Sequence, residues 1–311
     1  MKRKLIIHSF ELRKSWIDRM KKIGVDTIGI HPIGGAKAHE YLANDLINIY
    51  PTKKYRELID YAHNQGIEIE YSLHALSYLL PRSLFESHPD YFRINEKGER
   101  INDYNFCVSN EEALTYVCNR ASSLIEQLYG SNHNYYLWLD DLNGGQCFCD
   151  KCKKLSPSDQ NLVVMNAIIK TLRKKIPNAK LAYLGYYQTE KVPQTIKPEQ
   201  GIFLEYAPFT RDMRKSAQSV SNECKQNIRD LINYFGKENS WVLEYWYDNS
   251  YFSRRANNAM VEFFPLNDSI PSDIEYYLDF GFENVSSFAC FLGEEYEALY
   301  GEADLSAFEC K

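Results

Sequence analysis

Two adjacent carboxylates, Asp140 and Asp141, follow directly on an uncharged, aromatic run at residues 135–139. A Gly144-Gly145 pair comes next, and three cysteines follow between residues 147 and 152. An α/β barrel presents its catalytic groups in this way, because its strands end in loops at the C-terminal face. The stretch 135–152 therefore predicts a functional site at the end of a buried parallel strand.

Polar side chains also end several other uncharged runs of strand length. They are His31 after the second run, Glu70 and His74 in the third, Tyr186 and Tyr187 in the fifth, Glu205 in the sixth with Arg211 just beyond, and Glu244, Tyr245, Trp246 and Asp248 in the seventh. A carboxylate inside a strand is costly to bury unless it is paired or used. One such residue is explained by a solvated rim or an ion pair, but several with aromatics between them predict a polar cleft.

Carboxylates, tyrosines and histidines at strand ends fit glycoside hydrolysis, which needs one acid with a raised pKa and one ionised carboxylate. We expect Asp141 as the general acid and Glu244 as its ionised partner, with Asp140 beside them, and no cofactor for the chemistry. The residues expected to bind the sugar are His31, His74, Tyr186, Glu205, Arg211, Tyr245 and Trp246. The alternative is a carbohydrate-binding barrel without turnover.

Two finer expectations follow from these assignments. The planar guanidinium of Arg211 would suit the carboxylate of an acidic sugar, although pairing with Glu205 or Asp212 explains Arg211 equally. The fourth and seventh strands lie on roughly opposite sides of an eight-strand barrel, so Asp141 and Glu244 would flank the sugar. Because Asp is shorter than Glu, we expect a separation of about 6.5–9.5 Å and an inverting mechanism.

Eight uncharged or nearly uncharged runs alternate with amphipathic helical segments, which is typical of βαβ units in a parallel sheet. The expected strands are 4–10, 27–33, 67–73, 135–139, 180–187, 202–207, 241–247 and 285–292. We predict a single (β/α)8 barrel over residues 1–311, with a long loop at 75–108 after the third strand. Residues 188–200 hold two prolines and no helical stripe, so the fifth helix is expected to be weak or missing. A doubly wound sheet is the rival, but the chain has neither G-x-G-x-x-G nor a P-loop.

The cysteines of the fourth loop have the types and spacing of a zinc site. Cys147, Cys149 and Cys152 lie in a polar stretch, and Cys107 on the neighbouring loop could complete a closed four-ligand shell. The zinc would be structural and would hold the loop that carries Asp141. Free thiols, or one disulfide in an exported protein, are the alternatives.

The charge and composition of the chain argue against some classes of binding partner. The net charge of −6 argues against nucleic acid or an anionic membrane, and no run approaches the length of a membrane span. The 24 Tyr, 16 Phe and 4 Trp suit either core packing or stacking on sugar rings. The apolar stretch at residues 5–7 is too short for a signal-peptide core, so eight cysteines favour reduced thiols and a cytoplasmic location.

The chain also resembles the DUF4838 family of glycoside-hydrolase-like barrels from about His74 to its C-terminus. The residues that carry the resemblance are His74, His88-Pro89-Asp90-Tyr91-Phe92, Gly98-Glu99-Arg100, Cys107-Val108-Ser109-Asn110, Asp141 ahead of Cys147-x-Cys149-x-x-Cys152, Asn166, Arg211 and Glu244-Tyr245. The resemblance implies a TIM-type barrel distantly akin to α-glucuronidases and β-hexosaminidases, and a carbohydrate substrate. Asp140-Asp141 stands where β-hexosaminidase barrels have an Asp-Glu pair.

Overall fold

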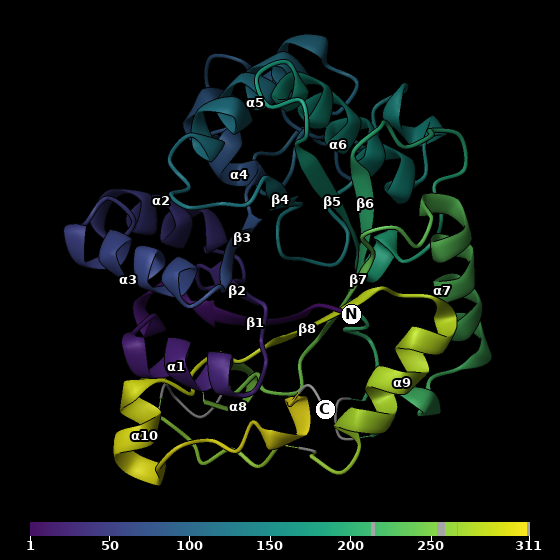
Figure 1. Cartoon of the computed structure of the whole chain (residues 1–311). Helices are drawn as coiled ribbons and strands as arrows, with labels where there is room; N and C mark the ends of the chain where they lie inside the picture. The colour runs from purple at the N-terminus through teal and green to yellow at the C-terminus, as the bar shows by residue number, and fades with distance from the viewer. Residues whose placement is uncertain (213–214, 254–258, 266, 310–311) are drawn as a thin grey trace.

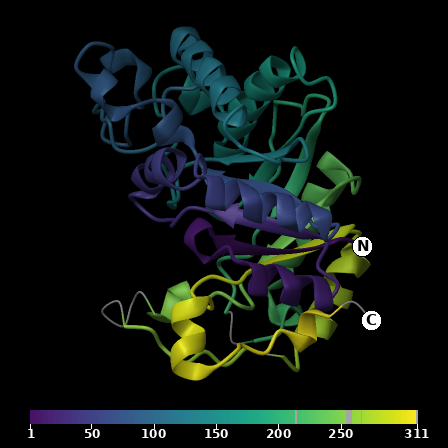
Figure 2. The same ribbon diagram turned by 60° about the vertical axis from the view of Figure 1, so that its left-hand side comes forward.

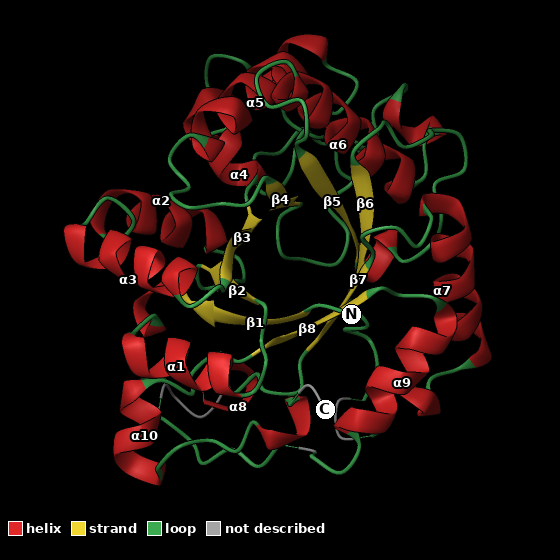
Figure 3. Cartoon of the chain, viewed as in Figure 1, coloured by secondary structure: helices red, strands yellow, loops and turns green. Residues whose placement is uncertain are grey.

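Eight parallel strands close into one barrel, in chain order around the ring. The computed structural model describes residues 1–212, 215–253, 259–265 and 267–309. The strands are β1 (Arg3–His8), β2 (Thr27–His31), β3 (Glu68–His74), β4 (Asn134–Trp138), β5 (Lys180–Gly185), β6 (Ile202–Tyr206), β7 (Trp241–Glu244) and β8 (Asn284–Phe288). Figure 1 and Figure 3 show this ring of strands with the helices outside it. The predicted (β/α)8 fold is confirmed.

The helices form the outer layer of the barrel. They are α1 (Lys14–Lys22), α2 (Ala38–Asn48), α3 (Lys53–Asn64), α4 (Leu76–Leu79), α5 (Glu111–Ile125), α6 (Pro157–Arg173), α7 (Asn222–Phe235), α8 (Ser250–Ser253), α9 (Ile270–Phe280) and α10 (Glu294–Tyr300). Helices α1 and α3 lie side by side (Figure 2). The Tyr61 hydroxyl on α3 donates to Asp18 on α1 at 2.7 Å. In the part of the chain that the structure describes, no helix is both long and apolar enough to span a membrane.

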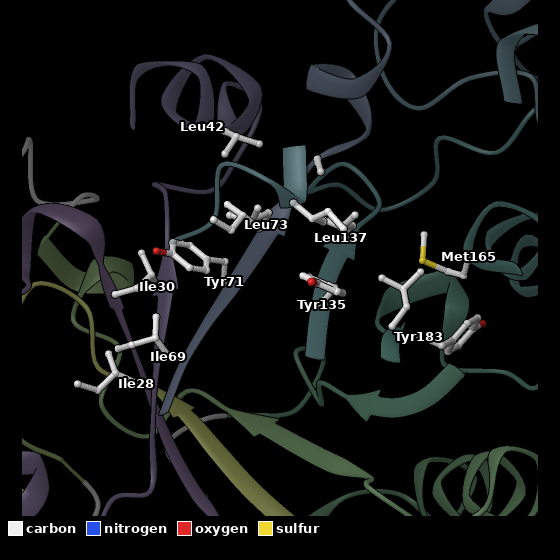
Figure 4. Packing of buried hydrophobic residues seen from close by; sticks show 14 of the residues in the cluster. Ile28, Ile30, Leu42, Ile69, Tyr71, Leu73, Tyr135, Leu137, Met165 and Tyr183 are labelled. Carbon is white, nitrogen blue, oxygen red and sulfur yellow. The ribbon is translucent and has the colours of Figure 1, made fainter. Parts of the chain in front are cut away.

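The strands bury side chains on both faces, because alternate residues point into the barrel and out towards the helices. Ile6, Tyr136, Leu243 and Phe288 belong to the cluster that fills the barrel. The larger cluster lies between strands and helices, and Figure 4 shows part of it, from Ile28 on β2 to Leu137 on β4. A residue's place in this alternation decides whether its side chain can reach a site inside the barrel.

The number of paired residues differs between neighbouring strands. Most neighbouring strands are in register over three to five residue pairs, as β1 and β2 are from Lys4↔Thr27 to His8↔His31. β4 pairs with β5 over two residue pairs, and β6 pairs with β7 over two, Glu205↔Trp241 and Tyr206↔Val242. The backbone pairing around the barrel is therefore shortest at two places, between β4 and β5 and between β6 and β7.

The irregular segments match the expectations in two places. The loop after β3 is long and holds α4, two short 3-10 turns (Arg82–Phe85 and Pro89–Tyr91) and the bridge Ile94↔Arg100. Between β5 and β6, where residues 186–201 are all described, the structure has one 3-10 turn, Tyr187–Thr189, and no α-helix.

Two kinds of detail differ from the expectations. Helix α2 was not among the expected elements. Most strands end two to four residues earlier than predicted, and after β5, β7 and β8 residues that were expected in the strand, among them Tyr186, Tyr245 and Cys290, line a cavity instead.

Candidate functional site

A cavity of about 440 Å³ opens at the C-terminal ends of the strands. This volume falls in the range of about 300–1,000 Å³ that is usual for small-molecule sites. Residues from all eight strands, or from the loops that follow them, line it: His8, His31, Gly34, Gly35, His74, Trp138, Asp141, Leu142, Leu184, Tyr186, Tyr187, Phe209, Leu243, Tyr245, Asp248, Ser250, Phe288 and Cys290. Ligand sites of α/β barrels lie at this face.

A larger groove of about 970 Å³ lies outside the barrel, along α1, α3 and α10. Most of its charged lining residues, such as Lys54, Glu57 and Glu295, are exposed on helix surfaces, and the buried Glu11 is held by backbone amides. The smaller cavity lies at the C-terminal ends of the strands and brings three buried histidines together with Asp141, so we take it as the candidate site.

Asp141 lies at this cavity and is held by three neighbours. The Gly35 amide donates to its Oδ2 at 2.6 Å, the Tyr186 hydroxyl donates to its Oδ1 at 3.0 Å, and His74 Nε2 lies 3.9 Å from Oδ1. Burial opposes ionisation of Asp141, but the charge of His74 and these hydrogen bonds together hold its pKa below the ordinary value. Asp141 is therefore ionised at neutral pH, which suits a base or nucleophile and not the general acid that we expected.

Three histidines end β1, β2 and β3 side by side at the same cavity. The Nδ1 atoms of His8, His31 and His74 lie 3.0, 2.6 and 2.6 Å from the carbonyl oxygens of His31, Ser72 and Leu139. Because a carbonyl only accepts, each Nδ1 carries the hydrogen. Burial, first of all, lowers the pKa of His31 to about 3, so its Nε2 is a neutral acceptor suited to a ligand hydroxyl.

Aromatic rings form the facing wall of the cavity. Phe209 contacts Tyr186, Tyr187 and Tyr245, with ring centroids 5.2–5.4 Å apart, and Tyr245 stacks on Phe288 at 5.3 Å. Tyr187 has φ +49°, a left-handed backbone conformation that is rare for a bulky residue. Such conformations gather at ligand sites, where the surrounding structure holds them.

Asp248 is a second carboxylate at the cavity. It follows β7, and its Oδ1 accepts the Ser250 amide at 2.8 Å. Burial raises the pKa of Tyr245 well above its ordinary value, and the charges of Asp141 and Asp248 raise it further. Asp141 and Asp248 both line the cavity, on the loops that follow β4 and β7.

The expected partner of Asp141 is elsewhere, and this part of the prediction is wrong. Glu244 lies between Leu243 and Tyr245, which line the cavity, so its side chain points to the helices and is fully buried there. It accepts from Arg211 Nε and Nη2 at 2.9 and 2.8 Å and from the Tyr277 hydroxyl at 2.5 Å. Because the two carboxylates lie on opposite sides of the barrel wall, the predicted separation and the inverting mechanism built on this pair fail.

Arg211 and Trp246 are also outside the cavity. The Arg211 side chain is 4% exposed and engaged with Glu244, which is the structural alternative to binding an acidic sugar. Trp246 shares the outward face of Glu244, and its Nε1 lies 3.3 Å from Asp273 Oδ2 on α9. Neither residue can contact a ligand at the strand ends.

Glu205 faces into the barrel but lies below the cavity. The Trp138 indole donates to Glu205 Oε2 at 2.8 Å, and Trp138 itself lines the cavity floor. Lys4 is fully buried between Glu70 and Glu205, with N–O distances of 3.1 and 3.5 Å. Burial raises the pKa of Glu205 to about 7, while Lys4 opposes the rise. Glu205 therefore belongs to an internal ionic cluster and acts on the cavity only through Trp138.

Asp140 is committed to holding the long loop after β3. Its carboxylate accepts from the Ser77 amide at 2.9 Å, the Ser77 hydroxyl at 2.6 Å and the Asn105 amide at 2.6 Å. It is buried and does not line the cavity, so the structure assigns it an anchoring position instead of a catalytic one.

Two groups of residues have the types and proximity of metal ligands. Cys107, Cys147, Cys149 and Cys152 have their sulfur atoms within 4.8 Å of one another, away from the cavity. His8, Glu11 and Cys290 are equally close, but Glu11 accepts the amides of His8, Leu292 and Gly293 at 3.0–3.2 Å. These hydrogen bonds to the backbone explain the position of Glu11, so the second group needs no metal ion to account for it.

Five of the residues expected at the site line the cavity, and their roles stay predictions: His31, His74, Asp141, Tyr186 and Tyr245. Tyr187 and Asp248, named at strand ends but given no role, line it too. His8, Phe209 and Phe288 also line it and were not singled out. His8 had a usable signal, since it ends its strand as His31 and His74 do.

With this geometry established, comparison with known proteins places the chain in a family. The model of the family described as a domain of unknown function, DUF4838, matches residues 8–294, so the chain belongs to that family. No curated protein matches the chain.

Several solved structures with a similar barrel are glycoside hydrolases. The β-galactosidase of the psychrophilic Marinomonas ef1 has a TM-score of 0.56 at 13% identity, over 92% of this chain and 54% of that one. A β-galactosidase from Rahnella sp. R3 has 0.57 at 11%, over 93% and 50%. A GH20 exo-β-N-acetylglucosaminidase from Vibrio harveyi has 0.53 at 12%, over 99% and 53%. The chain spans about half the length of these proteins, and at this identity the likeness establishes the barrel fold alone.

Proposed function

We propose that this protein is a glycoside hydrolase that binds a sugar ring in the cavity at the strand ends. The observation that carries the proposal is Asp141, an ionised carboxylate held by Gly35, Tyr186 and His74 opposite a wall of aromatic rings. Sugar rings present apolar faces to aromatics and hydroxyl groups to polar atoms such as His31 Nε2. An anionic group beside the anomeric carbon stabilises the oxocarbenium-like transition state.

In this proposal Asp141 is the nucleophile or the base that activates water, and Asp248 is the general acid. Glycosidases need a carboxylic acid to protonate the leaving oxygen, and Asp248 is the second carboxylate among the described lining residues. Tyr186 and His74 position Asp141 and keep it ionised.

The substrate is proposed to be a neutral sugar. Among the described residues that line the cavity none is Lys or Arg, whereas Asp141 and Asp248 are both acidic. An acidic sugar would meet these two carboxylates without a Lys or Arg to pair with. This reverses the expectation that was based on Arg211.

The test uses aryl glycosides that share a sugar but differ in leaving group, after a screen of neutral and acidic sugars. Asp248→Asn should lose most activity on glycosides with poor leaving groups and little on dinitrophenyl glycosides, which need no protonation. Asp141→Asn should lose activity on both. Asp279→Asn, an exposed carboxylate on α9, is the matched control. Equal losses in Asp248→Asn for both leaving groups would contradict the assignment of the acid.

The second candidate is a non-catalytic carbohydrate-binding barrel. It is favoured by the position of Glu244, since the strand-7 carboxylate expected for catalysis lies behind the barrel wall. Raised thermal stability with a sugar, together with no cleavage of any glycoside of that sugar, would support the binder and contradict the hydrolase.

A further inference from the structure

Four cysteines from two separate loops converge at one point beside the barrel. Cys107 ends the long insertion after β3, and Cys147, Cys149 and Cys152 belong to the loop after β4. Their four sulfur atoms lie within 4.8 Å of one another. Cys107, Cys147 and Cys152 are buried, and Cys149 is half-buried.

The sulfur–sulfur distances identify the kind of site. Cys107 Sγ lies 3.7 Å from Cys149 Sγ and 3.9 Å from Cys152 Sγ. Zn–S bonds of about 2.3 Å in a tetrahedron separate the sulfur atoms by roughly 3.8 Å. A disulfide needs about 2.05 Å, and an iron–sulfur cluster holds its thiolates farther apart because iron and sulfide lie between them. The spacing therefore fits one mononuclear ion.

The surroundings of the sulfur atoms are built for thiolates. The Ile94 amide donates to Cys147 Sγ at 3.4 Å, and the Cys152 amide donates to Cys149 Sγ at 3.4 Å. The Ser109 hydroxyl lies 3.2–3.4 Å from the sulfur atoms of Cys107, Cys149 and Cys152. Hydrogen bonds of this kind orient metal ligands and stabilise their charge.

One buried side chain fixes the loop from the helix behind it. Gln160 on α6 accepts the Cys147 amide at 2.9 Å and donates to the carbonyls of Cys147 and Cys152, each at 3.0 Å. The backbone of the cysteine loop is thus arranged independently of the sulfur atoms, so their convergence is a property of the fold.

We infer that Cys107, Cys147, Cys149 and Cys152 bind one Zn²⁺ in a closed, structural site. All four positions of the tetrahedron are filled by thiolates, and none of the four cysteines lines the cavity, so the ion has no position for substrate. Its effect is to fasten the loop after β4 to the insertion after β3.

The fastened segments are those that position the candidate site. Asp141 precedes the cysteine loop, and Asn105 precedes Cys107 in the insertion. Asn105 donates to the Gly145 carbonyl at 3.1 Å and receives the Asp140 amide at 3.0 Å. The zinc site thus closes a second connection between the same two loops and restricts how far Asp141 can move.

Metal content of the full-length protein tests the inference directly. Protein purified without chelator should contain about one equivalent of zinc by elemental analysis. After removal of the metal under reducing conditions, Co²⁺ should bind in one equivalent and give the visible absorption of tetrahedral thiolate coordination. Less than a tenth of an equivalent of zinc, with no uptake of Zn²⁺ or Co²⁺ by the reduced protein, would overturn the inference.

Variants separate the four ligands from the other thiols. Cys107→Ser and Cys149→Ser should each abolish the four-thiolate Co²⁺ spectrum and lower the melting temperature. Cys224→Ser, a half-buried thiol on α7, should leave both unchanged. If a ligand variant does not fold, the metal content and the cobalt spectrum of the unaltered protein still decide the matter. An unchanged cobalt spectrum in Cys107→Ser would exclude it as a ligand.

Discussion

Asp141 and Glu244 look alike in the sequence, yet they occupy opposite sides of the barrel wall. Each follows an aromatic or aliphatic run in a parallel strand. Asp141 lies three residues past β4, with 24% of its side chain exposed, and receives hydrogen bonds from Gly35 and Tyr186. Glu244 is the last residue of β7, is fully buried, and pairs with Arg211.

The difference comes from the alternation of side chains along a strand. A one-residue shift moves a side chain from the cavity to the helix layer. Leu243 and Tyr245 line the cavity, so Glu244 cannot. Asp141 escapes this constraint because it stands in a loop, where the chain can turn its side chain inwards. Residue type and strand end are therefore insufficient to assign a site without the inward or outward position.

The largest expected effect separates the two carboxylates by activity. Asp141→Asn should lower kcat/KM on the identified glycoside by about 10³-fold, because it removes the anionic group at the reacting carbon. Glu244→Gln should stay within about threefold of the unaltered protein at temperatures where it is folded. Comparable losses in both variants would show that Glu244 acts in catalysis, and the proposed difference between the two carboxylates would be wrong.

For the free energy of unfolding we expect the opposite order, with a larger effect of Glu244→Gln than of Asp141→Asn. Glu244→Gln removes the close charge partner of the buried Arg211, whose other carboxylate contact, Asp273, is 4.0 Å away, and should reduce the free energy of unfolding by roughly 3 kcal/mol in urea titrations. Asp141→Asn should change it by about 1 kcal/mol or less, since its side chain is partly exposed. Asp279→Asn serves as the control for loss of an exposed carboxylate. A stable Glu244→Gln protein would mean that the ion pair contributes little.

Glu205 extends the comparison to a carboxylate inside the barrel. Its pKa is raised from 4.5 to about 7, so between these pH values the folded protein binds more protons than the unfolded chain. The stability contributed by this group is complete below pH 4.5 and declines as pH rises towards 7. The unfolding free energy of the unaltered protein should therefore fall by roughly 3 kcal/mol relative to Glu205→Gln over this range. A constant difference between the two proteins would contradict the raised pKa.

The smallest expected effect concerns the glycine beside Asp141. A Cβ on Gly34 would lie 3.0 Å from Asp141 Oδ2 and 3.4 Å from His31 Nε2. Gly34→Ala should push the carboxylate aside and lower kcat/KM about tenfold, with a small change in melting temperature. Gly98→Ala, where a Cβ meets nothing within 4 Å, controls for the loss of a glycine, and because Gly98 has φ +82° its cost is confined to the local backbone. Full activity in Gly34→Ala would show that Asp141 tolerates displacement.

The sequence sufficed for the fold because eight uncharged runs separated by amphipathic helices leave few arrangements. It located His31, His74, Asp141 and the tyrosines, whose positions depend mainly on which strand they end. It misplaced Glu244, Arg211 and Trp246, because nothing in an all-buried strand marks which face points inwards. Asp248 was named at the end of the seventh run but given no role, since its position depends on how the chain turns after β7.

The Arg211–Glu244 ion pair lies where the backbone pairing between neighbouring strands, β6 and β7, is short. Local opening starts where few contacts hold a structure, and here two residue pairs join the strands, as they do between β4 and β5. Arg211, which follows β6, reaches Glu244 on β7, and Tyr277 of α9 binds the same carboxylate. The three side chains connect β6, β7 and α9 on the outer side of the barrel. We therefore expect this polar contact, which lies away from the cavity, to slow the opening of the wall and the exchange of the β7 amides with solvent.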